Sequence, residues 1–197
     1  MKNFAQKLEQ QLDIKIIHSK EPIPFESTYS INENDQIDAL RLTEVPLGKL
    51  DTLFPVASHL TELSLKECDI DTIHSIYEFG NLRSLDLGVN ELSNLDGIER
   101  LKALTELSLF GIELNDWETA FKNISALKEL KSLNLAMTNV ESIKGLQNAK
   151  SLERINLKSS WIEGFSDIEA FHSLRSLSIA SCDELDFDRI DDLRRLE

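Results

Sequence analysis

The stretch LRSLDLGVNELSNLDGIERLKA, residues 82–103, decides the fold of this chain. Leucine stands at its first, fourth and sixth positions, asparagine at the ninth and leucine at the eleventh. Positions four and six share one face of an extended strand, and the later apolar residues recur about every third position, which suits a tight helical return. One strand and one return cannot bury these leucines alone, so the stretch predicts a unit that must stack on neighbours.

The same pattern recurs along most of the chain. Its first positions lie 22 residues apart in two runs, which are joined by a step of 26 and preceded by a step of 23. These positions are Ile37, Leu60, Leu82, Leu104, Leu130, Leu152 and Leu174. In all seven repeats the first, fourth and sixth positions hold Leu or Ile. A fixed period of this length predicts a solenoid of stacked repeats.

On these positions, residues 37–197 resemble the leucine-rich repeat family. Residues 82–103 match its 22-residue class, typified by the nuclear phosphatase-1 regulator and the bacterial internalins. The resemblance implies an α/β solenoid with a parallel β-sheet on a concave face and short helices or 3-10 turns on the convex side. In the family, Asn, Cys or Thr at position nine bonds to the backbone of the bend. Cys68 and Cys182 hold this position and lie five repeats apart, so we interpret both as structural and unable to form a disulfide.

The fourth repeat carries four extra residues, about one helical turn. They lie in NDWETAFKNISAL, residues 115–127, where Asn115 followed by Glu118 predicts a helix start. The apolar residues of this segment recur at helical spacing and are Trp117, Phe121, Ile124 and Leu127. We expect a longer convex helix that leaves the sheet undisturbed, with these four residues in the core rather than in a ligand site.

Residues 1–36 do not follow the repeat and are predicted to cap its first open end, which a solenoid requires. KNFAQKLEQQL, residues 2–12, predicts a helix, and YSINENDQIDALRL, residues 29–42, predicts two strands around a polar turn. The predicted domains are therefore a cap, 1–36, and seven repeats, 37–197. This order also resembles the amino-terminal segment of bacterial Roco GTPases, although the chain has no G-x-x-x-x-G-K-[ST] motif.

The carboxyl-terminal residues allow two interpretations. Twenty-two residues beyond Leu174 stands Leu196, so an eighth repeat would begin there and the chain would be a fragment linked to a further domain. Alternatively, DFDRIDDLRRL, residues 186–196, forms a helix that caps the array alone. The acidic run at 183–192 lacks the glycine and terminal glutamate of a calcium loop, so we interpret it as a solvated helix face.

Composition excludes several classes of function. The net charge is -14, so the chain repels nucleic acid and anionic membrane surfaces. No segment is apolar enough for a signal peptide or a membrane span, and two cysteines indicate a reducing compartment such as the cytoplasm. The four histidines form no metal-binding spacing, and neither cysteine has a plausible histidine partner. We therefore predict no catalytic residue, no metal and no cofactor.

A binding surface remains, on positions three, five and seven, which point away from the leucines. Most of these residues are small and polar. Large apolar residues among them or at the adjoining positions look like interface anchors: Phe110, Met137, Trp161 and Val89. Charged residues that would orient a partner are Asp86, Glu106, Arg154 and Lys158.

Three hypotheses follow for this surface. The first is a non-catalytic module that binds a protein partner through the concave face. The second is a regulatory or scaffolding arm of a larger protein such as a bacterial Roco GTPase. The third is a phosphatase regulator like the namesake of the 22-residue class, which no residue of this chain supports. A structural alternative to all three gives the large apolar residues no partner, because loops fold over them or because they shield the strand edges.

Overall fold

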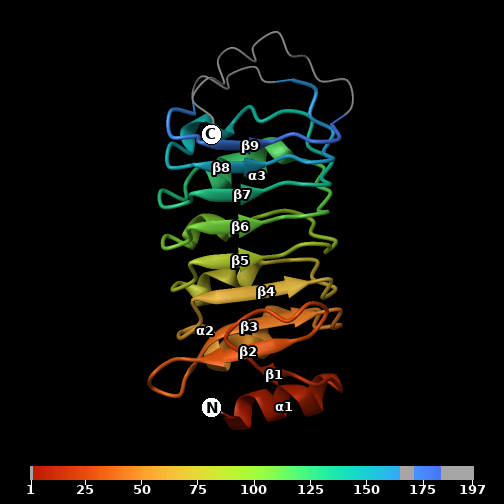
Figure 1. Cartoon of the computed structure of the whole chain (residues 1–197), viewed down its shortest axis with the longest axis vertical. Helices are drawn as coiled ribbons and strands as arrows, with labels where there is room; N and C mark the ends of the chain where they lie inside the picture. The colour runs from red at the N-terminus through yellow and green to blue at the C-terminus, as the bar shows by residue number, and fades with distance from the viewer. Residues whose placement is uncertain (1, 165–170, 183–197) are drawn as a thin grey trace.

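The computed structural model describes residues 2–164 and 171–182, whose strands form one sheet in the order β1 to β9 (Figure 1). The strands are β1 (Ile17–His18), β2 (Thr28–Ile31), β3 (Ile37–Thr43), β4 (Glu62–Lys66), β5 (Ser84–Asp86), β6 (Glu106–Ser108), β7 (Ser132–Asn134), β8 (Arg154–Asn156) and β9 (Ser176–Ser178). From β3 to β9 all neighbours are parallel and in one register, with Leu63 beside Leu85 and Leu85 beside Leu107. The predicted parallel sheet is confirmed.

Short helical segments return the chain between the strands of the repeats and lie behind the sheet in Figure 1, whereas the helix that precedes β1 lies at the amino-terminal end. The α-helices are α1 (Lys2–Leu12), α2 (Phe54–Ala57) and α3 (Trp117–Ile124). The 3-10 turns are η1 (Leu50–Leu53), η2 (His74–Phe79), η3 (Ile98–Arg100) and η4 (Leu146–Asn148). The spacing of three in the sequence therefore corresponds to 3-10 geometry, as expected for a tight return.

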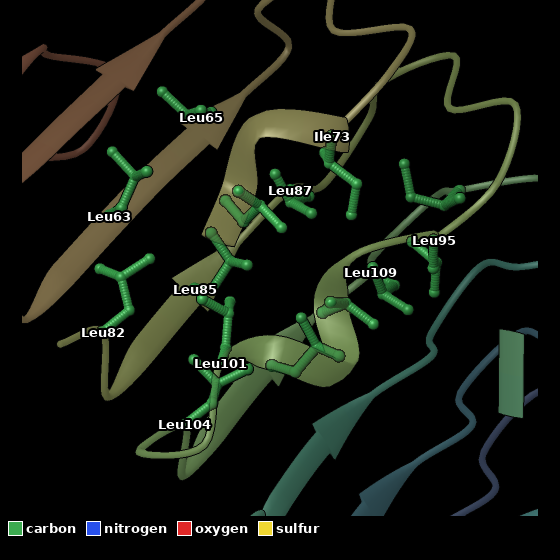
Figure 2. Close-up of a cluster of buried hydrophobic side chains, with 14 of the residues drawn as sticks. Leu63, Leu65, Ile73, Leu82, Leu85, Leu87, Leu95, Leu101, Leu104 and Leu109 are labelled. Atoms are coloured by element: carbon green, nitrogen blue, oxygen red, sulfur yellow. The ribbon is translucent and has the colours of Figure 1, made fainter. Parts of the chain in front are cut away.

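The core is the layer of leucines between the sheet and these returns. In the first six repeats every residue at positions one, four and six is buried, whereas Leu177 and Ile179 of the seventh are half-buried. Figure 2 shows Leu85 of β5 and Leu87, which follows the strand, in one layer with Ile73 and Leu95 of the returning segments. Each buried leucine contributes roughly 1.5–3 kcal/mol relative to exposure, so the stacked repeats hold one another.

The amino-terminal segment has the predicted helix and hairpin, with Ala5 and Leu8 of α1 buried. β2 and β3 are antiparallel, and the Asn32 side chain accepts from the backbone N–H of Asn34 and Gln36 in the turn between them. Sequence patterns did not predict β1, since two residues carry no period. The boundary between cap and array at residue 36 stays a prediction.

The insertion in the fourth repeat forms α3, and the register of β6 with β7 is undisturbed. The helix start differs by one residue from the prediction, because Asp116, not Asn115, accepts from Thr119 N–H at 2.9 Å. Phe121, Ile124 and Leu127 are buried as expected, but Trp117 is only half-buried.

The polar ladder at position nine is strongest at Asn90, which is buried. Its Oδ1 accepts from the N–H groups of Cys68 (2.9 Å) and Ile70 (3.0 Å), and its Nδ2 donates to Leu65 O at 2.6 Å. One side chain thereby ties the second repeat to the third. The alternatives for the carboxyl terminus, an eighth repeat, a closing helix or a solvated acidic run, fall on residues outside those described.

Candidate partner-binding surface

The face of the sheet opposite the core is formed by positions three, five and seven, as predicted. A hollow of about 330 Å³ lies on it, lined largely by Ser64, Ser84, Ser108, Ser132 and Asn134 together with charged neighbours. These side chains are short, so a partner can approach the strands closely. The three positions carry four cations and three carboxylates over seven repeats, a net charge of +1, whereas the chain as a whole carries -14. This face therefore repels a negatively charged protein far less than the remaining surface does.

One end of the face is already covered. Arg41 is 8% exposed and forms a two-armed ion pair with Glu62, in which Nη2 lies 2.8 Å from Oε2. The same guanidinium lies 3.4 Å from Lys20 O, and Pro22 lines the hollow nearby. The segment before β2 thus closes the face over the first repeat, and the accessible part begins with the second.

The four charged residues predicted to orient a partner differ in the exposure of their side chains and in the bonds that these side chains already make. Glu106 and Arg154 contact each other across the face at 3.7 Å, with about half of each side chain exposed. Asp86 is half-buried, and its Oδ1 accepts from Gly88 N–H at 2.9 Å. Lys158 is exposed. Glu106, Arg154 and Lys158 are accessible from solvent, whereas Asp86 supports the backbone bend that follows β5.

Phe110 is less exposed than its position suggests. It is half-buried beside Gly88, at which an added Cβ would lie 3.4 Å from the Phe110 Cβ. The ammonium of Lys66 lies 5.7 Å from its ring centroid, within the range of a cation–π contact. Phe110 therefore forms the wall of a second hollow, of about 230 Å³, together with Lys66 and Asp86.

The other three predicted anchors are exposed: 37% for Val89, 57% for Met137 and 63% for Trp161. They occupy positions eight, eight and ten, at the edge where all the parallel strands end. We call this edge, positions eight, ten and twelve of each repeat, the carboxyl-end rim. The structure thus places the apolar anchors on the rim of the sheet rather than on its face.

A further hollow escaped the sequence analysis. It measures about 650 Å³ and lies between α3 and the following repeat, lined by Trp117, Glu118, Phe121, Asn139, Glu141 and Lys144 among others. Asn139 holds its wall, because Oδ1 accepts from the indole N–H of Trp117 at 2.7 Å. The four-residue insertion is the sequence feature that could indicate this hollow, because an added helical turn does not have to pack closely against the neighbouring repeats.

The two cysteines behave as structural residues in the described part of the chain. Both are free thiols, and Cys68 is buried. Burial raises the pKa of the Cys68 thiol to about 11, so it is protonated and unreactive at neutral pH. Its Sγ lies 3.3 Å from Lys66 O, and Cys182 Sγ lies 3.0 Å from Leu157 O. These contacts match the structural interpretation.

Residues 2–164 and 171–182 contain neither a metal-binding cluster nor a membrane-spanning helix. No three His, Cys, Asp or Glu side chains gather there in a way that could hold a metal ion. No helix in that part of the chain has the length and apolar character needed to cross a membrane.

Comparison with known proteins identifies the fold of the repeats. No family model matches the chain. Tubulin-specific chaperone E of Drosophila melanogaster is 29% identical over 133 residues, covering 59% of this chain and 25% of that protein. The chain thus spans about a quarter of the length of this curated relative.

Among solved structures, internalin C2 of Listeria monocytogenes superposes with a TM-score of 0.69 at 18% identity, covering 81% of this chain and 67% of that one. A leucine-rich repeat protein of Leptospira interrogans superposes with a TM-score of 0.64 at 26% identity, covering 76% and 38%. The chain is a leucine-rich repeat solenoid. These relatives do not include a Roco GTPase, so the Roco resemblance stays a prediction.

Proposed function

We propose that this leucine-rich repeat solenoid is a non-catalytic module that binds a protein partner across the open face of its sheet and its carboxyl-end rim. The observation that carries the proposal is the exposure of Val89, Met137 and Trp161 together on that rim. Exposed apolar side chains beside a face of short polar ones are typical of interface anchors with a polar surround. Phe110 adds a half-buried aromatic wall rather than a free anchor.

The experiment is affinity capture from an extract of the source cells, with mass spectrometry of what is bound. Met137→Ala combined with Trp161→Ala is expected to lose the captured partner without a large fall in Tm, because both side chains are mostly exposed. Tyr77→Ala is the matched control, since Tyr77 is 47% exposed on the η2 return, away from the face. Capture that survives the double variant, or is lost equally in the control, contradicts the proposal.

A second proposal is that the array is a regulatory or scaffolding region of a longer protein, such as a bacterial Roco GTPase. Its support is that the curated relative is about four times as long as the part matched here. An antibody against this chain, used on an immunoblot of the source cells, distinguishes the two. A species much longer than 197 residues supports the second proposal, and a species of that length contradicts it.

We also propose a cytoplasmic location, supported by the two free cysteines. Fractionation of the source cells followed by immunoblotting tests it, and recovery of the chain outside the cytoplasmic fraction contradicts it.

A further inference from the structure

The residues at position eight form one column along the carboxyl-end rim. Their backbone N–H groups donate to the position-seven carbonyl of the next repeat at 2.8–3.1 Å, from Glu44 through to Ser159. Successive members are therefore about one strand spacing apart, ~4.8 Å. The side chains of the column are Glu44, Glu67, Val89, Gly111, Met137, Ser159 and Ser181.

Every member of this column has a positive φ, between 55° and 67°. Glycine adopts this left-handed conformation freely, whereas other residues are strained in it, β-branched ones most of all. Only one of the seven is glycine, and the third is Val89, which is β-branched and exposed. The hydrogen bonds of the column impose this conformation on its members, and non-glycine residues held in it cluster at functional sites in proteins.

Gly111 leaves a notch in the column between Val89 and Met137. A Cβ added to Gly111 would lie 3.4 Å from Val89 Cγ2 and would meet no other residue within 4 Å. Met137 follows in the next repeat, with 57% of its surface exposed. Two apolar side chains thus flank a gap of one residue, which fits a single apolar side chain from outside.

Carboxylates surround this notch. Within the described residues, positions eight, ten and twelve hold eight exposed acidic side chains and no cation: Glu44, Glu67, Asp69, Asp71, Glu91, Glu113, Glu141 and Glu163. The cations nearest in sequence, Lys66 and Lys158, stand at position seven on the inner side of the column.

In repeats three to seven the opposite edge of the sheet, where the strands begin, carries mostly cations. Two positions of each repeat lie at this edge: the residue that stands two before position one, and the residue that follows position one. In repeats three to seven these positions hold six exposed cations and one acid, whereas the same positions of the first repeat hold Asp35 and Asp38. The cations are Arg83, Lys102, Lys128, Lys131, Lys150 and Arg175. A partner segment on the carboxyl-end rim therefore meets a field that selects for positive charge, while the opposite rim selects against it.

We infer that the carboxyl-end rim binds a positively charged segment of a protein partner, with one apolar side chain seated over Gly111 between Val89 and Met137. This inference rests on the proposed function and specifies the chemistry of the partner. Trp161, at position ten of the sixth repeat, adds an exposed ring on which a lysine or arginine of the segment can stack.

The test uses a displayed library of random peptides, selected on the immobilised wild-type chain. The variant is Val89→Asn with Met137→Asn, because asparagine tolerates positive φ and removes the apolar surface without disturbing the backbone. Ser159→Asn is the matched control, since it makes the same replacement in the same column. We expect enriched peptides with a net positive charge and an apolar residue. The double variant should weaken their binding by about tenfold or more, and the control should not.

The possible outcomes separate this inference from the proposed function. Peptides that lose affinity on the double variant but carry no net positive charge, or whose affinity does not fall as salt rises, overturn the inference and leave the surface as a binding site. Peptides that bind the double variant as tightly as the wild-type chain, or a library without any enrichment, contradict the inference that the segment docks on the carboxyl-end rim. The affinity capture described above then decides separately whether the module binds a protein at all.

Discussion

Repeats three and four (residues 82–103 and 104–129) have the same strand framework and differ where the strand ends. Repeat three has Val89 and Asn90 at positions eight and nine, whereas repeat four has Gly111 and Ile112. Asn90 bridges backbone groups of two repeats, but Ile112 has no polar atom in its side chain to do so. The bend that follows the strand is therefore stabilised by different interactions in the two neighbouring repeats.

In repeat four the polar bridge has moved outward by one position and comes from the next repeat. Asn139, at position ten, accepts from Leu114 N–H at 3.1 Å and donates to Leu114 O at 3.1 Å, while also holding Trp117. The bridge thus secures the start of α3 instead of the end of the strand. The leucines of the framework therefore fix the stacking of the repeats, while the residues that follow them can differ from one repeat to the next.

Removing the bridge of repeat three should have the largest effect. Asn90→Ala leaves the buried N–H groups of Cys68 and Ile70 and the carbonyl of Leu65 without their partner. We expect a loss of about 3 kcal/mol or more in the free energy of unfolding, measured by urea denaturation. Asn94→Ala is the control, because Asn94 bonds only to nearby groups in the same repeat. Equal losses for the two variants would contradict the bridging role.

The thiol of Cys68 reports whether that loss is local. Burial holds its pKa at about 11, above its ordinary value of 9.0, so folding stability due to this group is complete below pH 9 and declines as pH rises toward 11. In the wild-type chain at neutral pH, a thiol reagent should modify Cys182 first and Cys68 only through unfolding. In Asn90→Ala, Cys68 should react faster, and an unchanged rate would indicate that the bend stays closed.

Gly111→Val would give repeat four the same residue at position eight as repeat three. The new side chain would take a φ of +67° and bring its Cβ to 3.4 Å from Val89 Cγ2. We expect a loss of about 2 kcal/mol, again by urea denaturation. Gly80→Val is the control, since φ there is ordinary and the nearest contact of an added Cβ is 3.8 Å. A stability equal to that of the control would show that the column tolerates any residue.

The reciprocal change, Val89→Gly, should stabilise the chain slightly. Relief of the strained φ of 55° outweighs the entropy that glycine adds to the unfolded state by about 0.5 kcal/mol. If Val89 serves a partner, this more stable variant binds the selected cationic peptides less tightly. A variant that is destabilised would place Val89 among the residues that hold the fold.

These contrasts also explain what the sequence could and could not predict. The core was predictable, because positions such as Leu85 and Leu107 repeat with a period that only stacking satisfies. The exposure of Phe110 was not, since it depends on Gly88 and Lys66 in earlier repeats, which align only once the register is known. The hollow at α3 likewise depends on side chains from two repeats.

The smallest effect concerns the helix that only repeat four possesses. Thr119 N–H donates to Asp116 at the start of α3, and this bond lowers the pKa of the carboxyl group. Because the folded pKa lies below the unfolded one, the carboxylate stabilises the folded state at neutral pH, and this contribution disappears as pH falls through the folded pKa. Asp116→Asn retains an acceptor but loses the charge that favours a helix amino terminus. We expect a slightly lower Tm at neutral pH and a difference that vanishes in acid, followed by circular dichroism. Asp71→Asn, which removes a charge on the rim without a helix cap, is the control. A Tm difference for Asp116→Asn that is independent of pH would mean that the cap acts through geometry alone.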